Sequence, residues 1–394
     1  MAGTAVVVGG GIGGLASAVA LADAGWRTTV LERARELGEV GAGVALTPNA
    51  VASLDGLGLD GDAVAAMGPR TWAAGTWDSR GRPILRLPDD PAEGANTTLR
   101  GVHRARLHGA LLGRARQLGV EVVTDVRVTT VDAGGPAAPA RVRYADRAGA
   151  QDEREAELVV GADGVRSAVR RALFPDRLPV YSGFSSWRAV EPGLSAGPSL
   201  RQYWGARAEF GAMPVSDGAT YWYGYVAMPE GTRLDDEHGA AVERFTGWAP
   251  EVRDVIAATP PGAVIRHDVL HLPGGLPRYV RGRVVMVGDA AHATLPTMGQ
   301  GAATALEDGV CVGRIVAAGV ASGQSLGRAL AVYDAARRPR CRALARASVA
   351  SGRFGSHLGP RWQGLRNALM RRTPASAVTR GTRAVMGWRP PEAP

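Results

Sequence analysis

A glycine-rich turn near the beginning of the sequence constrains the fold more than any other feature. The pattern GxGxxG directly follows the apolar, β-branched run Ala5–Val8, and its turn contains Gly9, Gly11, Gly13 and Gly14. Glycine permits a tight turn and lets backbone N–H groups approach a pyrophosphate at the positive end of a helix. The pattern therefore predicts a strand, a phosphate-binding turn and a helix, in that order.

The residues after this turn complete a βαβ unit. Leu15–Ala24 is rich in helix-forming residues and ends at Gly25, and Thr28–Leu31 has strand character. Glu32 follows this second strand, where a carboxylate can accept hydrogen bonds from ribose hydroxyls. We therefore expect an α/β fold of the Rossmann type, and the motif by itself does not separate FAD from NAD.

A second motif follows the predicted strand Leu158–Gly161. The chain turns through Asp163-Gly164 and then has the composition of a helix. Without further information, this pattern is equally well interpreted as a turn with a helix N-cap.

The third motif covers Val284–Asp308. A buried strand ends at Gly288-Asp289, and ligands bind at the carboxyl ends of strands in open α/β sheets. Further on, the segment Gly299–Gly301 (GQG) begins another helix. The positive end of that helix is suited to stabilising negative charge on the edge of a flavin ring.

The composition excludes several classes of function. The net charge is +9, and all 46 basic residues are arginines because the chain has no lysine. This excludes P-loop nucleotidases, pyridoxal-phosphate enzymes and mechanisms that need a Schiff base. The arginines are spread evenly and no nucleic-acid-binding module is present, so we expect no nucleic-acid partner. Arginines do attract anionic nucleotides and carboxylates.

The remaining composition indicates a cytoplasmic protein. Cys311 and Cys341 form neither a CxxC pair nor a disulfide framework, and no ligand cluster for a metal is apparent. No apolar run approaches the roughly 20 residues that a membrane span needs, and no export signal precedes the first strand.

The character of the sequence changes between about Tyr181 and Val269. Alternating, aromatic-rich stretches such as Thr220–Met228 favour an antiparallel sheet. Strand character typical of a parallel sheet returns at Val284–Val287, and the chain after Gly299 is largely helical. Within that part, Arg361–Arg372 (RWQGLRNALMRR) is basic and amphipathic. It favours a surface helix that covers the core, with contact to a membrane surface as the alternative.

The order GxGxxG, DG, GD over about residues 4–345 resembles the class A flavoprotein monooxygenases, which have the p-hydroxybenzoate hydroxylase fold. Ser186–Val190 and Ala212–Val215 are similar to the short branch with urate hydroxylase, 6-hydroxynicotinate hydroxylase and zeaxanthin epoxidase. The resemblance implies tightly bound FAD, with NADPH or NADH as a transient co-substrate. It also implies hydroxylation or epoxidation of an aromatic or heteroaromatic molecule by O2 through a C4a-hydroperoxyflavin, such as a tailoring step in natural-product metabolism.

The resemblance also implies a domain organisation. A Rossmann-like FAD-binding domain of the GR2 type is expected over residues 1–72, 97–178 and 279–330. A substrate-binding antiparallel-sheet domain is expected over residues 73–96 and 179–278, and C-terminal helices over residues 331–394. A monomer or a homodimer is consistent with this organisation.

Cofactor-binding residues are implied by the same resemblance. The first motif and its surroundings would hold the ADP half of FAD. Asp163 lies in the segment that the family associates with both FAD and NADPH. Asp289 would bind the ribityl chain, and the segment from Pro296 to Ala302 would line the flavin ring. Arg104 matches an arginine that reaches the flavin from a helix start, and Val128 matches a backbone contact to adenine. The full predicted set is Gly9, Gly11, Gly13, Gly14, Glu32, Arg33, Gly43, Val44, Arg104, Val128, Asp163, Asp289, Pro296, Gly299, Gln300, Gly301 and Ala302.

The substrate site is predicted on the inserted sheet. Tyr221, Tyr223 and Tyr225 share one face of a strand and could form an aromatic platform, unless the opposite face with Trp222 points inward. Arg188, Glu209 and Pro296 are further candidates. Glu209 aligns with a substrate-binding arginine of the urate enzymes, which argues against urate.

No catalytic base is assigned from the sequence. His292 lies in the GDAAH segment, where a structural role is favoured, and His267 and His271 lie on a predicted strand. In the GQG region, Ala302-Ala303 stands where many members have an asparagine.

Rival functions on the same fold remain. Flavin halogenases need a lysine and a WxWxIP segment, and the chain has neither. An alkene reductase of the geranylgeranyl-reductase type and a flavin-binding protein without turnover stay open as alternatives.

Overall fold

A parallel sheet holds the glycine-rich turn at the carboxyl end of one of its central strands. The computed structural model describes residues 3–38, 42–92 and 95–392. The sheet has the order β17-β18-β11-β1-β2-β7, and only β17 runs antiparallel to its neighbour. Its strands are β1 (Thr4–Val8), β2 (Arg27–Leu31), β7 (Glu121–Val123), β11 (Leu158–Gly161), β17 (Val280–Arg281) and β18 (Val284–Met286). The predicted βαβ opening and the later parallel strands are therefore confirmed.

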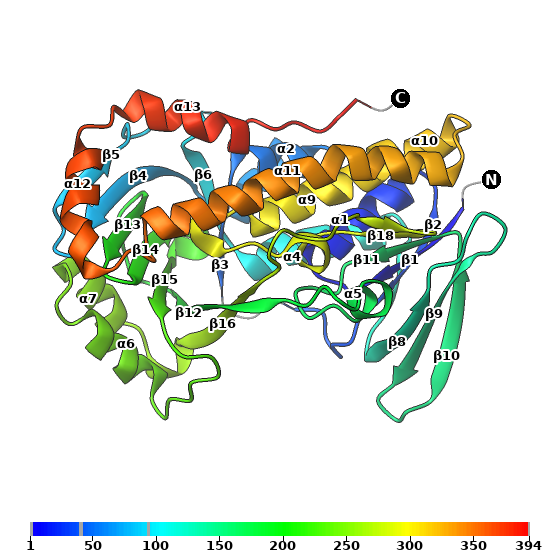
Figure 1. The fold of residues 1–394 in the computed structure, drawn as a ribbon, viewed down its shortest axis with the longest axis horizontal. Helices are drawn as coiled ribbons and strands as arrows, with labels where there is room; N and C mark the ends of the chain where they lie inside the picture. Colours follow the sequence, from blue (N-terminus) through cyan, green and yellow to red (C-terminus); the bar gives the residue numbers. More distant parts are fainter. Residues whose placement is uncertain (1–2, 39–41, 93–94, 393–394) are drawn as a thin grey trace.

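Helices pack closely around this sheet (Figure 1). Helix α1 (Ile12–Asp23) lies beside α9 (Gly301–Cys311), and a Cβ atom on Gly309 would come within 2.5 Å of the Ala16 Cβ. Small residues thus let the two helices that follow the first and third motifs touch each other. The other helices of this region are α2 (Pro48–Asp55), α3 (Gly61–Met67), α4 (Arg104–Gln117), α5 (Ala168–Leu173) and α8 (Asp289–His292).

A small antiparallel sheet lies at one end of the molecule. It consists of β8 (Val126–Asp132), β9 (Ala140–Asp146) and β10 (Gln151–Ala156), in the order β10-β9-β8. Figure 1 shows it near the N-terminus, at the end opposite the C-terminal helices α12 and α13. The side chains of Val128, Val142 and Tyr144 pack into the same core as the parallel sheet.

The larger sheet has the order β16-β12-β15-β14-β13-β4-β6-β3, with β5 paired to β4. Its neighbours are antiparallel except for the parallel pair β13 and β4. The strands are β3 (Gly43–Leu46), β4 (Arg70–Asp78), β5 (Pro83–Arg86), β6 (Thr98–His103), β12 (Val180–Glu191), β13 (Leu200–Gly205), β14 (Ala208–Pro214), β15 (Thr220–Ala227) and β16 (Ile265–His271).

The two faces of this sheet have different partners. On one face Trp222 stacks on Phe210 at 5.7 Å between ring centroids, in a cluster that includes residues of α6 (Glu237–Phe245) and α7 (Pro250–Ala257). On the other face Tyr221 packs with Ala42 and Met213 next to β3. The tyrosines of β15 therefore point away from α6 and α7 and toward the nucleotide-binding side.

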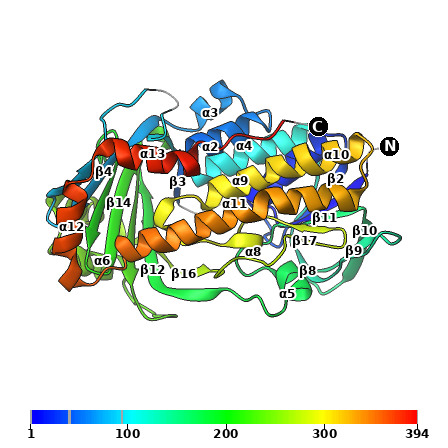
Figure 2. The ribbon, with the colours of Figure 1, turned by 45° about the horizontal axis from the view of Figure 1, so that its top comes forward.

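The C-terminal part is helical, as the sequence predicts. A π-helical stretch, η4 (Val312–Ala317), joins α9 to the short helix α10 (Ala318–Ala321). Helix α11 (Leu326–Phe354) then runs beside α9 and spans both main sheets, as Figures 1 and 2 show. Helices α12 (Gln363–Arg371) and α13 (Ala375–Met386) follow at the far end. Among the described residues, no helix is both long and apolar enough to span a membrane.

Two details differ from the sequence-based expectations. The predicted domain limits at 72/73 and 330/331 fall inside β4 and α11, so single elements continue across them; the division into domains stays a prediction. The expectation that Arg361–Arg372 covers the core is wrong for its large apolar side chains, because Trp362, Leu365 and Leu369 are exposed.

Candidate active site

The glycine-rich turn has no room for side chains at two of its positions. Gly9 has a φ of +106°, and a Cβ on Gly14 would lie 1.9 Å from the Gly9 carbonyl oxygen. A Cβ on Gly11 would meet no atom of the described residues within 4 Å, so they leave open space above its backbone. The turn is thus tight where it packs against itself and accessible where a pyrophosphate would approach.

Two side chains hold this turn from outside. Glu32 Oε2 accepts a hydrogen bond from the Gly10 N–H at 2.7 Å, and its Oε1 accepts one from the Ala34 N–H at 2.9 Å. The buried His108 ring lies 2.7 Å from the Gly10 carbonyl oxygen. His108 is not among the residues predicted from the sequence. Glu32 stands beside the turn, as its position after β2 predicts, while Arg33 next to it is exposed.

The GD motif presents an unengaged carboxylate. Gly288 has a φ of +56°, and its N–H donates to Asp308 Oδ2 at 2.8 Å. Asp289 is exposed, and its side chain accepts no hydrogen bond from the described residues. The carbonyl oxygens of Asp289 and Ala290 accept from the buried Arg170 guanidinium. This loop is therefore held by its backbone, which leaves the Asp289 carboxylate available to a hydroxyl-bearing ligand.

The DG motif uses its aspartate locally. The Asp163 carboxylate accepts hydrogen bonds from the Ser167 hydroxyl and from the N–H groups of Ala168 (2.6 Å) and Val169 (3.1 Å). These contacts cap the first turn of α5. The capping interpretation thus describes the side chain in this structure, and contact of Asp163 with FAD or NADPH stays a prediction.

The segment from Pro296 to Ala302 forms a tight loop at the start of α9. Gly299 adopts a left-handed conformation (φ +62°), and within the described part of the chain a Cβ on Gly299 or Gly301 would meet nothing within 4 Å. The buried Gln300 side chain points inward, where its Oε1 accepts from Asn49 Nδ2 at 3.0 Å. The loop therefore presents backbone and open space rather than the Gln300 amide.

A buried charge network supports the GD and GQG motifs. Arg337 lies 2.7 Å from Asp308 Oδ1 and 2.8 Å from Glu307 Oε2. Arg340 donates to Glu307 at 2.6 Å, and His292 Nε2 lies 2.5 Å from Asp308 Oδ2. The structural role expected for His292 fits this position. Glu307 and Asp308 lie within the third motif but are not among the site residues predicted from the sequence.

The charges in this network stabilise one another. Burial opposes ionisation of Asp308, but His292 and Arg337 outweigh it and lower the pKa of Asp308 to about 2. Burial likewise opposes a charged His292, but Cys341 and Asp308 outweigh it and raise the pKa of His292. Ligand atoms of His292, Asp308 and Cys341 lie within 4.8 Å of one another. Because Arg337 and His292 already occupy the Asp308 oxygens, this cluster is better explained as structural than as a cation site.

Strand β3 brings several predicted cofactor residues to the larger sheet. Gly43 pairs with His103, and the Arg104 N–H at the start of α4 donates to the Ala42 carbonyl oxygen at 2.8 Å. A Cβ on Gly43 would lie 2.2 Å from the Tyr221 ring. The half-buried Val44 follows Gly43 on β3. Gly43, Val44 and Arg104 are thus gathered beside the tyrosine face. Val128 is not, because it lies on β8 of the small sheet.

Each tyrosine of β15 occupies a row across several strands. Arg188, Tyr223, Gly211 and Gln202 face one another on β12, β15, β14 and β13. A Cβ on Gly211 would lie 2.4 Å from the Tyr223 ring, so the glycine lets Tyr223 lean toward β13. The next row holds Tyr225, which stacks with Phe184 at 4.8 Å.

Glu209 is a buried carboxyl group on this tyrosine face. Its Oε1 accepts hydrogen bonds from the Tyr223 hydroxyl at 2.7 Å and from Gln202 Nε2 at 3.1 Å. Burial raises the pKa of Glu209 to about 7, against the effect of the Tyr223 hydrogen bond. Two buried donors beside the carboxyl, Ser356 Oγ and Trp204 Nε1, have no hydrogen-bond partner among the described residues. Near neutral pH this carboxyl can therefore either donate or accept a proton.

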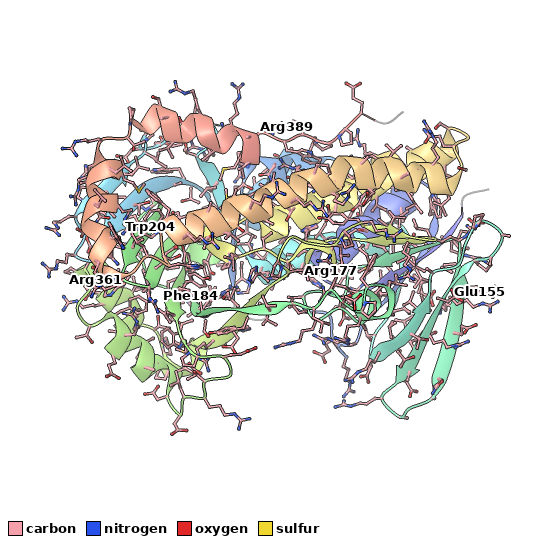
Figure 3. All side chains as sticks on the ribbon, in the orientation of Figure 1. Glu155, Arg177, Phe184, Trp204, Arg361 and Arg389 are labelled. Atoms are coloured by element: carbon pink, nitrogen blue, oxygen red, sulfur yellow. The ribbon has the colours of Figure 1, made fainter. Side chains whose placement is uncertain are left out.

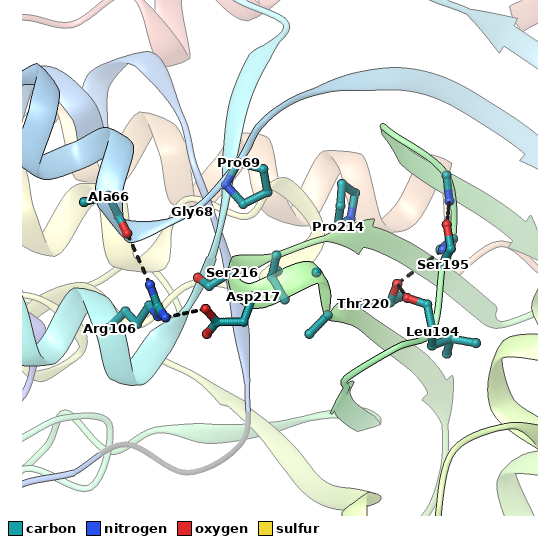
Figure 4. A pocket seen from close by; sticks show the side chains of 15 residues that line it. Ala66, Gly68, Pro69, Arg106, Leu194, Ser195, Pro214, Ser216, Asp217 and Thr220 are labelled. Atoms are coloured by element: carbon teal, nitrogen blue, oxygen red, sulfur yellow. Dashed lines mark hydrogen bonds and ion pairs between the residues drawn. The ribbon is translucent and has the colours of Figure 1, made fainter.

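A separate hollow of about 440 Å³ lies between Gly68, Arg106 and the turn after β14 (Figure 4). Arg106 donates there to the Ala66 carbonyl oxygen at 3.2 Å and pairs with Asp217. Its lining contains none of the predicted site residues. It therefore does not belong to the candidate site.

The residues present fit a bound FAD. Open space lies above Gly11, Gly299 and Gly301, and the Asp289 carboxylate is unengaged among the described residues. The open space lies at the starts of α1 and α9, whose N–H groups favour phosphate and an electron-rich ring edge, and Asp289 begins α8.

The chain is similar in sequence and fold to known flavoproteins. The chain matches the FAD binding domain family over residues 3–348. It is 34% identical to the aurachin C monooxygenase/isomerase of Stigmatella aurantiaca over 98% of both chains. It is 32% identical to the FAD-dependent urate hydroxylase of Klebsiella pneumoniae over 86% of this chain and 87% of the relative.

A solved structure agrees with these relatives. Klebsiella pneumoniae HpxO in complex with FAD and uric acid superposes with a TM-score of 0.85 at 27% identity, over 96% of this chain and 95% of that one. The chain belongs to the FAD-binding family of class A aromatic monooxygenases and is a FAD-dependent monooxygenase.

Proposed function

We propose that this enzyme uses NAD(P)H and O2 to hydroxylate or epoxidise a neutral heteroaromatic ring that carries an N–H group. The observation that supports the substrate class is the presence of two polar groups, Arg188 and Glu209, on the tyrosine face. Arg188 on β12 pairs with Tyr223, and Glu209 on β14 lies in the neighbouring row, where it accepts a hydrogen bond from the Tyr223 hydroxyl.

The two polar groups suit two different edges of one ring. The Arg188 guanidinium makes no ion pair with a described carboxylate and can donate to a ring carbonyl or phenolate oxygen. Glu209 can accept a hydrogen bond from a ring N–H. When Glu209 is ionised, a substrate carboxylate next to it would meet a like charge in a buried setting, which disfavours benzoate-type substrates.

The cofactor residues act mainly through the backbone in this proposal. Gly9, Gly11 and Gly14 admit the pyrophosphate, Glu32 lies beside the ribose, and Asp289 binds the ribityl chain. Bound FAD supplies the oxygen-activating chemistry, and the protein positions the ring and excludes water. Tyr221, Tyr223 and Tyr225 provide aromatic surface on the side of the sheet that faces Gly43.

We also infer a cytoplasmic location. The free thiols of Cys311 and Cys341 are both buried and suit a reducing compartment. A monomer and a homodimer both fit this setting.

Anaerobic reduction of the bound flavin tests the proposed substrate class. We expect NADPH or NADH to bleach the absorbance near ~450 nm slowly, and a 4-hydroxyquinoline or 4-quinolone to accelerate bleaching. The matched N-methyl analogue, which cannot donate to Glu209, should accelerate it much less. Equal acceleration by both compounds, or stronger acceleration by a benzoate, would contradict the proposed recognition. A protein that cannot be loaded with FAD would contradict the cofactor assignment itself.

A further inference from the structure

Helix α12 and Trp362, the residue directly before it, present apolar side chains to solvent. Trp362, Leu365 and Leu369 are 62%, 65% and 57% exposed, and their spacing puts them on one side of the helix. Most apolar side chains of this size in the chain are buried. These three residues are called the α12 patch below.

The orientation of α12 is fixed by a buried arginine on its opposite side. Arg366 donates to the carbonyl oxygens of Phe354 at 3.1 Å and Gly355 at 3.2 Å, where α11 ends. Its guanidinium also lies 5.0 Å from the centre of the Trp204 ring. Rotating α12 to bury the patch would move Arg366 away from the end of α11. The carbonyl oxygens of Phe354 and Gly355 would then lose their hydrogen-bond donor. The outward patch is therefore a stable feature of the fold.

The patch lies at one extreme end of the molecule. Figure 1 shows α12 at the end opposite the small sheet of β8, β9 and β10, and Figure 3 labels Arg361 there and Glu155 at the other end. On its inner side α12 packs on β5, where Arg371 donates to the Pro83 carbonyl oxygen at 3.1 Å. The outer side of α12 is thus free to meet a flat surface.

The part of the sequence that contains the patch is strongly basic, and the nearby Asp78 carboxylate pairs with Arg371. The sequence from residue 335 to residue 391 contains no aspartate or glutamate. Arg361 and Arg372 flank the patch, are exposed, and make no ion pair with the described residues. By contrast, Arg141 and Arg143, which are exposed on the small sheet, are paired with Glu155 at 2.8 Å and Glu153 at 2.6 Å.

We propose that the α12 patch attaches the enzyme peripherally to an anionic lipid bilayer. Trp362, Leu365 and Leu369 would enter the boundary between headgroups and acyl chains, and Arg361 and Arg372 would bind lipid phosphates. A second copy of the chain suits this surface less well. A symmetric dimer through the patch would bring two sets of unpaired arginines together.

The attachment has a consequence for access to the active site. Trp204 lies between Arg366 and Glu209, so α12 is close to the Glu209 side of the tyrosine face. Binding through α12 turns this end of the sheet toward the lipid surface, where apolar ring compounds accumulate. The lipid-binding proposal itself does not depend on the proposed substrate class.

Flotation of the FAD-loaded enzyme with vesicles tests the proposal. We expect binding to phosphatidylcholine vesicles that contain phosphatidylglycerol, weaker binding at high salt, and little binding to phosphatidylcholine alone. Joint replacement of Trp362, Leu365 and Leu369 by serine should lower the bound fraction at least roughly tenfold. Arg361→Gln with Arg372→Gln should lower the affinity for anionic vesicles by roughly tenfold or more.

A matched control uses exposed apolar residues elsewhere. Leu178, Val180 and Val242 are 55%, 45% and 39% exposed, and their joint replacement by serine should leave vesicle binding unchanged. Bound FAD and thermal unfolding of each variant report whether it is folded. Failure of the unmodified enzyme to float with anionic vesicles would overturn the proposal. An equal loss in the control variant would overturn it too, as would a patch variant that turns a dimer into a monomer without changing flotation.

Discussion

The nucleotide-binding region and the tyrosine face are built in different ways. The first depends on backbone conformation at closely spaced glycines, such as Gly9 and Gly14, which leave no room for side chains. The second depends on side chains such as Arg188, Glu209 and Tyr223 that meet across separate strands. A backbone site leaves a local sequence pattern, whereas a side-chain site is visible only after the strands are paired.

The buried network of Glu307, Asp308 and Arg337 combines the two kinds of construction, because its side chains support a backbone site. Its acidic residues lie inside the third motif, but their basic partner comes from α11. Side chains distant in sequence therefore hold a backbone site in place. The following predictions test how strictly backbone and side-chain roles are separated.

The largest effect is expected from Gly14→Val. A side chain at this position would overlap the Gly9 carbonyl oxygen, so the turn would open and the protein should lose nearly all bound FAD. The ratio of flavin to protein absorbance after purification measures this loss. Gly109→Ala on α4, where a Cβ meets nothing within 4 Å, should keep its FAD. Retention of FAD by Gly14→Val would show that the tight turn is dispensable.

A large loss of stability is expected from Arg337→Leu. The change removes the one cation that contacts both Glu307 and Asp308, and leaves Arg340 beside Glu307 and His292 beside Asp308. Breaking a buried ion pair in this way typically costs about 3–5 kcal/mol. Urea unfolding followed by circular dichroism measures it. Arg154→Leu breaks the exposed pair with Glu121 and should cost no more than about 1 kcal/mol. If the two variants lose similar stability, the buried network does not support the motifs in the way described.

A smaller, pH-dependent effect is expected at Glu209. Because its pKa is raised to about 7 in the folded state, protonated Glu209 stabilises the fold at low pH, and this stability is lost as the pH rises through about 7. The difference from the ordinary pKa corresponds to roughly 3 kcal/mol. Glu209→Gln should therefore show a smaller loss of stability between about pH 5 and pH 8 than the unmodified enzyme.

Flavin content provides the control for this variant. Glu209→Gln should bind FAD normally, since Glu209 belongs to the side-chain site and not to the backbone site. An unchanged pH profile in Glu209→Gln would mean that another group titrates. Loss of FAD in this variant would show that a side chain of the tyrosine face also contributes to FAD binding, which would contradict the proposed difference between the two regions.

Local sequence predicted the backbone part of the protein well. The order of strand, glycine turn, helix and strand is confirmed at β1, α1 and β2, and the GD motif does end a parallel strand. These features are encoded by residues close in sequence, because the conformation of glycine and the burial of β-branched runs are local properties. The cofactor class and the enzyme family were implied by the family resemblance that the three motifs carry together.

Tertiary structure alone decided how side chains are used. Glu209 became a buried acid because Tyr223 leans over Gly211 toward it, and no spacing in the sequence shows that contact. The apolar side of α12 faces outward because Arg366 binds the end of α11, although its amphipathic pattern suggested a helix that covers the core. Periodicity shows which residues share a face, and only the packed neighbours determine whether that face meets protein or solvent.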